Sequence, residues 1–135
     1  MPTGKTKDAG WQIGVSRTID APLAAVWEWL TAREGVRLWL GPGATLPTAK
    51  GDTYETADGI RGELRSYRPD DRIRLTWQPA TWSHDSTVQV AVQAKGAKTM
   101  VRFHQERLVD GAEREQQRSY WGSILNRLDT EIAEG

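Results

Sequence analysis

The stretch AEREQQRSYWGSILNRLDTEIAE, residues 112–134, decides the fold because it contains no proline and carries apolar residues at helical spacing. Trp121, Leu125, Leu128 and Ile132 recur every three or four residues, which predicts one long helix with an apolar side. Upstream of this helix lie several segments in which polar and apolar residues alternate. A curved antiparallel sheet closed over one long helix can leave an internal cavity between the two.

Six upstream segments have the alternating pattern of strands. They cover residues 11–19, 52–57, 60–67, 72–78, 86–93 and 99–105, and residues 45–50 are a candidate for a seventh strand. Asp58-Gly59 is a strong hairpin signal, so neighbouring strands should pair antiparallel. One face of the sheet is predicted to be apolar and covered by the long helix; it holds Ile73, Leu75, Trp77, Val88, Val90, Val92, Val101 and Phe103.

Two short helices are expected between the first and second strands. Asp20 can cap the first helix, Pro22 suits its first turn, and the helix should run to about Thr31. The second helix covers about residues 34–40 and ends at Gly41-Pro42-Gly43, which stops any helix. The predicted class is therefore α+β: a strand, two helices, five or six strands and a long helix.

The composition fits one domain and excludes several classes of function. The 135 residues carry 18 basic and 18 acidic side chains, and a net charge of zero gives no basis for nucleic-acid binding. The absence of cysteine excludes disulfides and thiolate metal sites. We expect a flexible tail over residues 1–10 and a single domain over residues 11–135. No apolar stretch approaches the roughly 20 residues that span a bilayer, so membrane insertion is not expected and the cytoplasm is the default location.

Several short motifs follow one another in a characteristic order. They are Ile19-Asp20-Ala21-Pro22, Val26-Trp27, Trp39, Gly51-Asp52, Gly62-Glu63-Leu64, Leu75-Thr76-Trp77, Ser86, Thr99 and Trp121-Gly122 with Leu125 and Leu128. Over about residues 11–133 this series resembles the SRPBCC (START-like, helix-grip) superfamily, and within it the branch of activator of heat-shock-protein-90 ATPase homologue-like proteins. The resemblance implies a helix-grip fold, in which a seven-stranded antiparallel sheet grips a long C-terminal helix around a cavity. It also implies ligand binding for some members, enzymatic activity for others, and chaperone activation for the proteins that give the branch its name.

Catalytic and metal-binding patterns are weak in this chain. The two histidines, His84 and His104, stand apart, and with no cysteine they supply no zinc-ligand spacing. His104 shares strand parity with Met100 and Arg102 and is expected on the outer face of the sheet. His84-Asp85 could form an acid–base pair at a cavity mouth, and a solvated turn is the other interpretation. No catalytic residue, metal site or cofactor is therefore predicted.

Seven tryptophans beside a single phenylalanine are the most unusual feature of the composition. Large rings fill a core, and an indole N–H can also orient a polar ligand atom in an apolar pocket. Trp27 and Trp121 are expected in the core, and Trp29 is expected to be partly exposed. The better pocket candidates, at helix ends, strand faces and loop rims, are Trp39, Tyr54, Trp77 and Trp82.

We therefore predict that the domain binds a small, mostly apolar molecule, such as a lipid, an aromatic or a polyketide-like compound, between the sheet and the last helix. Arg114, Gln117 and Arg118 precede Trp121 on the helix and either face the cavity mouth or project into water; in the first case Arg118 could meet a carboxylate or a phenolate. The competing hypotheses are a cyclase- or hydratase-type enzyme that uses the same cavity, and a module that binds a chaperone or another protein partner. The expected wall and polar contacts are Trp39, Tyr54, Leu64, Trp77, Val90, Phe103, Gln105, Gln117, Arg118, Trp121 and Leu125.

Overall fold

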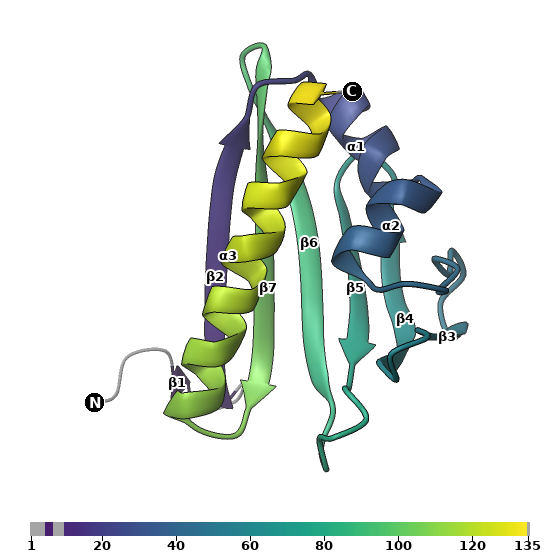
Figure 1. The fold of residues 1–135 in the computed structure, drawn as a ribbon, viewed down its shortest axis with the longest axis vertical. Helices are drawn as coiled ribbons and strands as arrows, with labels where there is room; N and C mark the ends of the chain where they lie inside the picture. The colour runs from purple at the N-terminus through teal and green to yellow at the C-terminus, as the bar shows by residue number, and fades with distance from the viewer. Residues whose placement is uncertain (1–4, 7–9, 135) are drawn as a thin grey trace.

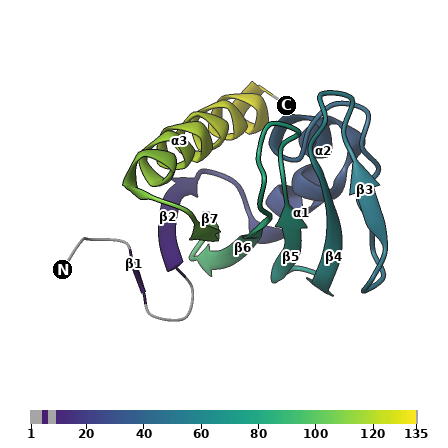
Figure 2. The ribbon, with the colours of Figure 1, turned by 90° about the horizontal axis from the view of Figure 1, so that it is seen from below.

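The computed structural model describes residues 5–6 and 10–134, and it shows one antiparallel sheet with all three described helices on the same face (Figure 1, Figure 2). The strands are β1 (Lys5–Thr6), β2 (Gly10–Ile19), β3 (Thr53–Glu55), β4 (Arg61–Arg68), β5 (Arg72–Trp77), β6 (Ser86–Lys95) and β7 (Lys98–Leu108). The helices are α1 (Leu23–Thr31), α2 (Arg33–Trp39) and α3 (Gly111–Glu134). The strand order is β1-β2-β7-β6-β5-β4-β3, so the first long strand pairs with the last.

The predicted α+β helix-grip fold is confirmed, with each predicted helix and strand within a few residues of its expected bounds. One detail is wrong, because residues 45–50 form no strand and the seventh strand is β1. A strand of two residues is too short to show a polarity period, so no pattern in the sequence indicates β1. Residues 1–4 and 7–9 lie outside the described residues, and the flexible tail and the single domain over 11–135 stay predictions.

The start of α1 differs from the expected cap. Pro22 is the residue before the helix; its backbone is extended, and its carbonyl accepts hydrogen bonds from the amides of Ala25 and Val26. No side chain caps the helix, so the predicted capping by Asp20 is wrong. The reason is that Pro22 places the first helical residue at Leu23, which leaves Asp20 two positions too early to reach the free amides.

The covered face of the sheet holds the core. Helix α3 packs along β2 and β7, and α1 packs on β6 and β7 (Figure 2). In β5 the side chains alternate strictly between buried and partly exposed, as the sequence predicted. Arg17 lies on this apolar face of β2, and its guanidinium finds partners on α3. It pairs with Asp129 at 2.8 Å and donates to Asn126 Oδ1 at 2.6 Å. The charged residue that interrupts the strand pattern thus ties the first long strand to the last helix.

Candidate functional site

A chain of aromatic rings fills the space between the sheet and α3. Trp39 at the end of α2 contacts Phe103 of β7, with ring centroids 6.1 Å apart. Phe103 stacks on Trp121 of α3 at 4.6 Å, and Trp121 contacts Trp77 of β5 at 5.7 Å. All four side chains are buried, so four of the five aromatic residues predicted for the site meet in the interior, and Tyr54 of β3 is not among them.

Three hydrogen bonds through two buried polar side chains hold this aromatic cluster in place. The Trp121 indole N–H donates to Gln105 Oε1 at 2.8 Å, and Gln105 Nε2 donates to the Ser86 hydroxyl at 2.9 Å. The Ser86 hydroxyl in turn donates to the backbone carbonyl of Trp77 at 2.7 Å. Gln105 and Ser86 are both fully buried, so these bonds form where competition from water is excluded. Gln105, predicted as a ligand contact, therefore already serves to orient Trp121.

Two buried polar atoms beside the same cluster have no hydrogen-bond partner among the described residues. They are the indole Nε1 of Trp77, a donor, and the amide Oε1 of Gln117, an acceptor. Trp77 is 3% exposed and Gln117 is 9% exposed. An unpaired buried polar group costs roughly 1–3 kcal/mol, and native proteins contain few of them. These two atoms are the best markers of a functional site in the interior.

Both atoms lie at the end of the molecule where α3 begins. Gln117 stands one helical turn before Trp121. Tyr120, the residue before Trp121, contacts Trp77 with ring centroids 6.0 Å apart. Burial raises the pKa of the Tyr120 hydroxyl, and the nearby Asp58 carboxylate adds to the rise, so this phenol stays protonated. Sequence reasoning did not select Tyr120, because it lies outside the predicted apolar stripe of the helix.

The start of α3 is fixed by a reciprocal cap. Asp110 Oδ1 accepts the Glu113 amide N–H at 2.8 Å, and Glu113 Oε1 accepts the Val109 amide N–H at 3.2 Å. Glu113 also contacts His84 Nε2 at 2.9 Å, which joins the helix start to the loop between β5 and β6. Gln117 follows one turn later, and its position is therefore set by this cap.

The loop of residues 78–85, between β5 and β6, covers Trp77. Trp82 packs edge-on against Trp77 with ring centroids 5.4 Å apart, and His84 stacks on Trp82 at 4.8 Å. Gln78 Nε2 donates to the Trp82 carbonyl at 2.8 Å and holds the loop closed on itself. Trp82, which the sequence placed at a pocket rim, is half-buried and separates Trp77 from solvent.

The structure does not form the acid–base pair considered for His84 and Asp85. His84 Nδ1 lies 2.8 Å from the backbone oxygen of Asp85, while the Asp85 carboxylate pairs with Arg107 at 3.1 Å. Among the described residues no cluster of three His, Asp or Glu side chains could hold a metal ion. His84 here links a loop to a helix, through contacts with Trp82 and Glu113.

The remaining predicted site residues divide into two groups. Leu64, Val90 and Leu125 are buried in the core as expected. Tyr54 is buried in β3 and donates its hydroxyl to the Thr76 carbonyl at 2.6 Å, and burial raises its pKa. Arg118 is exposed, although it neighbours buried Gln117, because one residue along a helix turns the side chain by about 100°. Among residues 114–118, Gln117 is buried and Arg118 projects into water, and a cavity mouth at Gln117 stays a prediction.

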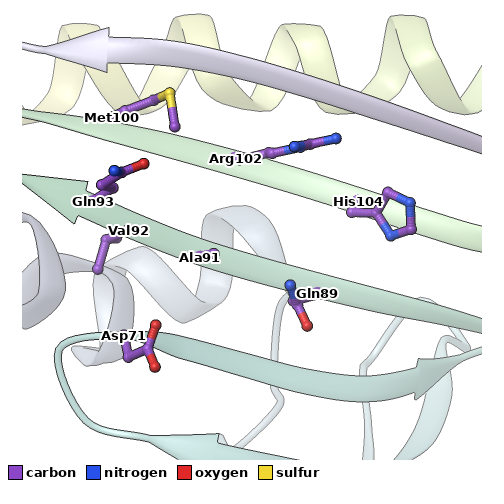
Figure 3. Close-up of a pocket in the computed structure, with 8 residues that line it drawn as sticks. All are labelled: Asp71, Gln89, Ala91, Val92, Gln93, Met100, Arg102 and His104. Carbon is purple, nitrogen blue, oxygen red and sulfur yellow. The ribbon is translucent and has the colours of Figure 1, made fainter.

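The outer face of the sheet carries a polar hollow of about 510 Å³ (Figure 3). It lies over β6 and β7, and Met100, Arg102 and His104 line it together, as their parity predicted. Burial lowers the pKa of His104; the Glu106 carboxylate opposes this, and the Arg102 and Arg74 guanidinium groups add to the lowering. Polar side chains of both strands surround this hollow, and Ala91 and Val92 of β6 also line it (Figure 3).

Comparisons with known proteins place the chain in a family. A family model described as "Activator of Hsp90 ATPase homolog 1-like protein" matches residues 20–133. No curated protein matches the chain.

Among the described residues, no helix has both the length and the apolar character that crossing a membrane requires.

Several solved structures share the fold. CalU16 from Micromonospora echinospora is 19% identical, with a TM-score of 0.79, and the match covers 95% of this chain and 79% of CalU16. PFC0360w, an Hsp90 activator from Plasmodium falciparum, is 18% identical, with a TM-score of 0.75 and coverage of 90% and 96%. DynU16, from the dynemicin biosynthetic locus, is 20% identical, with a TM-score of 0.78, and the match covers 90% of this chain. The chain spans about half of DynU16, 47% of its length. At these identities the likeness shows the shared fold alone.

Proposed function

The chain belongs to the family of activator of Hsp90 ATPase homolog 1-like proteins, and from the geometry of its interior we propose that it binds a small, mostly apolar molecule between β5 and the first turns of α3. The unpaired donor of Trp77 and the unpaired acceptor of Gln117 carry this proposal. A ligand group that both accepts and donates, such as a hydroxyl, would complement the two atoms. The surrounding rings supply the apolar wall that a small-molecule site needs.

The charge of the interior favours a neutral ligand. Among the buried side chains that the structure describes, the polar ones are threonine, serine and glutamine, and none carries a charge at neutral pH. Burying an ionised group without a partner is far more costly than burying a hydroxyl. The exposed Arg118 is therefore not part of this site, and a hydroxylated aromatic or polyketide-like compound fits better than a carboxylate.

Access to the site requires movement of the loop of residues 78–85. Trp82 occupies the outer side of Trp77, and the loop is tied to α3 by the His84–Glu113 contact. A ligand ring would take the place of Trp82 against Trp77, and its polar group would reach Nε1. This exchange replaces one aromatic contact with another, so the hydrogen bonds to the ligand supply the net gain.

Tryptophan fluorescence with a panel of hydroxylated aromatic compounds and the same compounds lacking the hydroxyl tests the proposal. Trp77→Phe keeps an aromatic ring and removes the donor, and it should weaken binding of a hydroxylated hit by roughly 2- to 10-fold. Trp29→Phe, which changes a half-buried tryptophan of α1, is the matched control and should leave the affinity unchanged. Equal affinity for hydroxylated and plain compounds, or no effect of Trp77→Phe, would contradict the proposed site.

The family membership and the shared fold of PFC0360w, an Hsp90 activator, favour a second candidate function, activation of an Hsp90-type ATPase. The assay is the ATPase rate of the chaperone with and without this protein. Stimulation that persists in Trp77→Phe would assign this function to a different surface from the ligand site. An enzyme that uses the interior site stays the third hypothesis, and turnover of a bound ligand would distinguish it.

A further inference from the structure

A second hollow, of about 660 Å³, lies beside α2. Residues of α2 line one side of it, and the loop of residues 42–46 that follows this helix lines the other. Its size is in the range of small-molecule sites, about 300–1,000 Å³. None of the eleven residues predicted for the interior site lines it, so it is a separate feature.

Two arginines of α2 line this hollow without a carboxylate partner. Arg33 and Arg37 are four residues apart, so their side chains share one face of the helix. Within the described part of the chain neither guanidinium forms an ion pair, whereas Arg17, Arg74 and Arg107 each have one. Two like charges at this spacing repel each other, and an anion between them would remove that cost.

The facing loop offers further hydrogen-bond donors. Over residues 5–6 and 10–134, the backbone amides of Ala44, Thr45 and Leu46 make no hydrogen bond to the protein. The loop is held in place because the Ala57 amide donates to the Pro42 carbonyl at 2.7 Å. Backbone N–H groups that are fixed and unpaired are suited to oxyanions, as are guanidinium groups.

The floor of the hollow is apolar. Val36 is 3% exposed, and Leu46 is half-buried against the core. Leu46 is the more exposed of the two, and a short apolar body would remove its remaining surface from water, which a ligand that carried only charge would not do. The site therefore has a cationic rim and an apolar base.

We propose that this hollow binds a small molecule that carries one oxyanion, a carboxylate or a phosphate, on a short apolar body. The oxyanion lies between the guanidinium groups of Arg33 and Arg37 and accepts hydrogen bonds from amides of residues 44–46. The apolar body lies on Val36 and Leu46. This site is chemically the opposite of the interior site, which is uncharged, so the two would bind different ligands.

The test uses octanoate, octyl phosphate and octanol as probes in calorimetry at low salt, with the full chain. Octanoate and octyl phosphate should bind and octanol should not; the tighter of the two anions identifies the preferred oxyanion. In amide NMR spectra, octanoate should shift the signals of residues 44–46. Binding of octanol as tight as that of octanoate would overturn the proposal.

Variants separate this site from general charge and from the interior site. The double variant Arg33→Gln, Arg37→Gln should weaken octanoate binding at least 10-fold, whereas Arg68→Gln with Arg127→Gln removes two exposed charges elsewhere and should change it less than 2-fold. Arg37→Gln alone provides an intermediate loss if the double variant folds poorly. Trp77→Phe should leave octanoate binding unchanged. Retained binding in the double variant, or loss of binding in Trp77→Phe, would refute this site without bearing on hydroxylated ligands of the interior.

Discussion

Replacing Gln117 with methionine should stabilise the ligand-free protein and weaken ligand binding. Methionine has a similar length, a similar helix propensity and no oxygen that must be paired. Gln117 Oε1 is buried without a partner, and leaving such an acceptor unpaired costs roughly 1–3 kcal/mol. The variant removes this cost from the folded state.

The size of the gain follows from the position of Gln117. Oε1 is buried although the residue as a whole is 9% exposed, so we expect the gain in the lower half of that range, at about 1–2 kcal/mol. For a chain of 135 residues each kcal/mol shifts the melting temperature by roughly 3–5 °C. We therefore expect Gln117→Met to melt about 3–10 °C higher than the wild-type protein.

Urea and thermal unfolding, followed by circular dichroism, measure this difference. Gln116→Met is the matched control, because Gln116 is the preceding residue of the same helix and is exposed; its stability should change by less than about 0.5 kcal/mol. A Gln117→Met variant that is no more stable than Gln116→Met would show that Oε1 has a partner. The Gln117 half of the proposed site would then be lost.

Three further predictions test other features of the structure, each by urea unfolding. Ser86→Ala should destabilise the protein by about 1–3 kcal/mol because it leaves Gln105 Nε2 buried without its acceptor. A neutral effect would contradict the hydrogen bond between Gln105 and Ser86. Gly62→Ala should lower the free energy of unfolding by more than about 3 kcal/mol, because the added Cβ would lie 1.9 Å from the backbone oxygen of Thr76. Gly122→Ala is the control: nothing lies within 4 Å of its added Cβ, so it should raise the free energy of unfolding by about 0.5–1 kcal/mol. Similar effects of the two variants would refute the close approach at Gly62. His104 has a lowered pKa, so the unfolded chain binds its proton more readily and stability falls as the pH drops below about 6.5. Lowering the pH from about 7.5 to about 5 should thus destabilise the wild-type protein more than His104→Gln, and parallel pH curves would exclude this cause.

The limits of sequence reasoning are clearest at Gln105 and Gln117. Both were predicted as polar contacts of a ligand, and both are buried near Trp121. Yet Gln105 is bonded to Trp121 and Ser86, and Gln117 Oε1 is unpaired. Spacing along a helix or strand can place a side chain on the buried face, but a hydrogen bond depends on distances between elements that meet only in the folded chain. The same limit explains why the sequence analysis did not select Arg33 and Arg37 of α2, since the facing loop is needed to make a hollow beside them.

The sequence by itself determined the order of the helices and of strands β2 to β7, the antiparallel sheet and the buried face, because these follow from periodicity, turn residues and helix stops that act over a few residues. It also determined that a long helix covers the sheet, since the apolar side of that helix, which includes Trp121, must be buried. The tertiary structure decided which polar atoms are paired, that the loop of residues 78–85 covers Trp77, and that Arg118 faces water. These properties depend on the relative positions of β5, β6 and α3, which are set by packing over long sequence separations and have no local pattern in the chain.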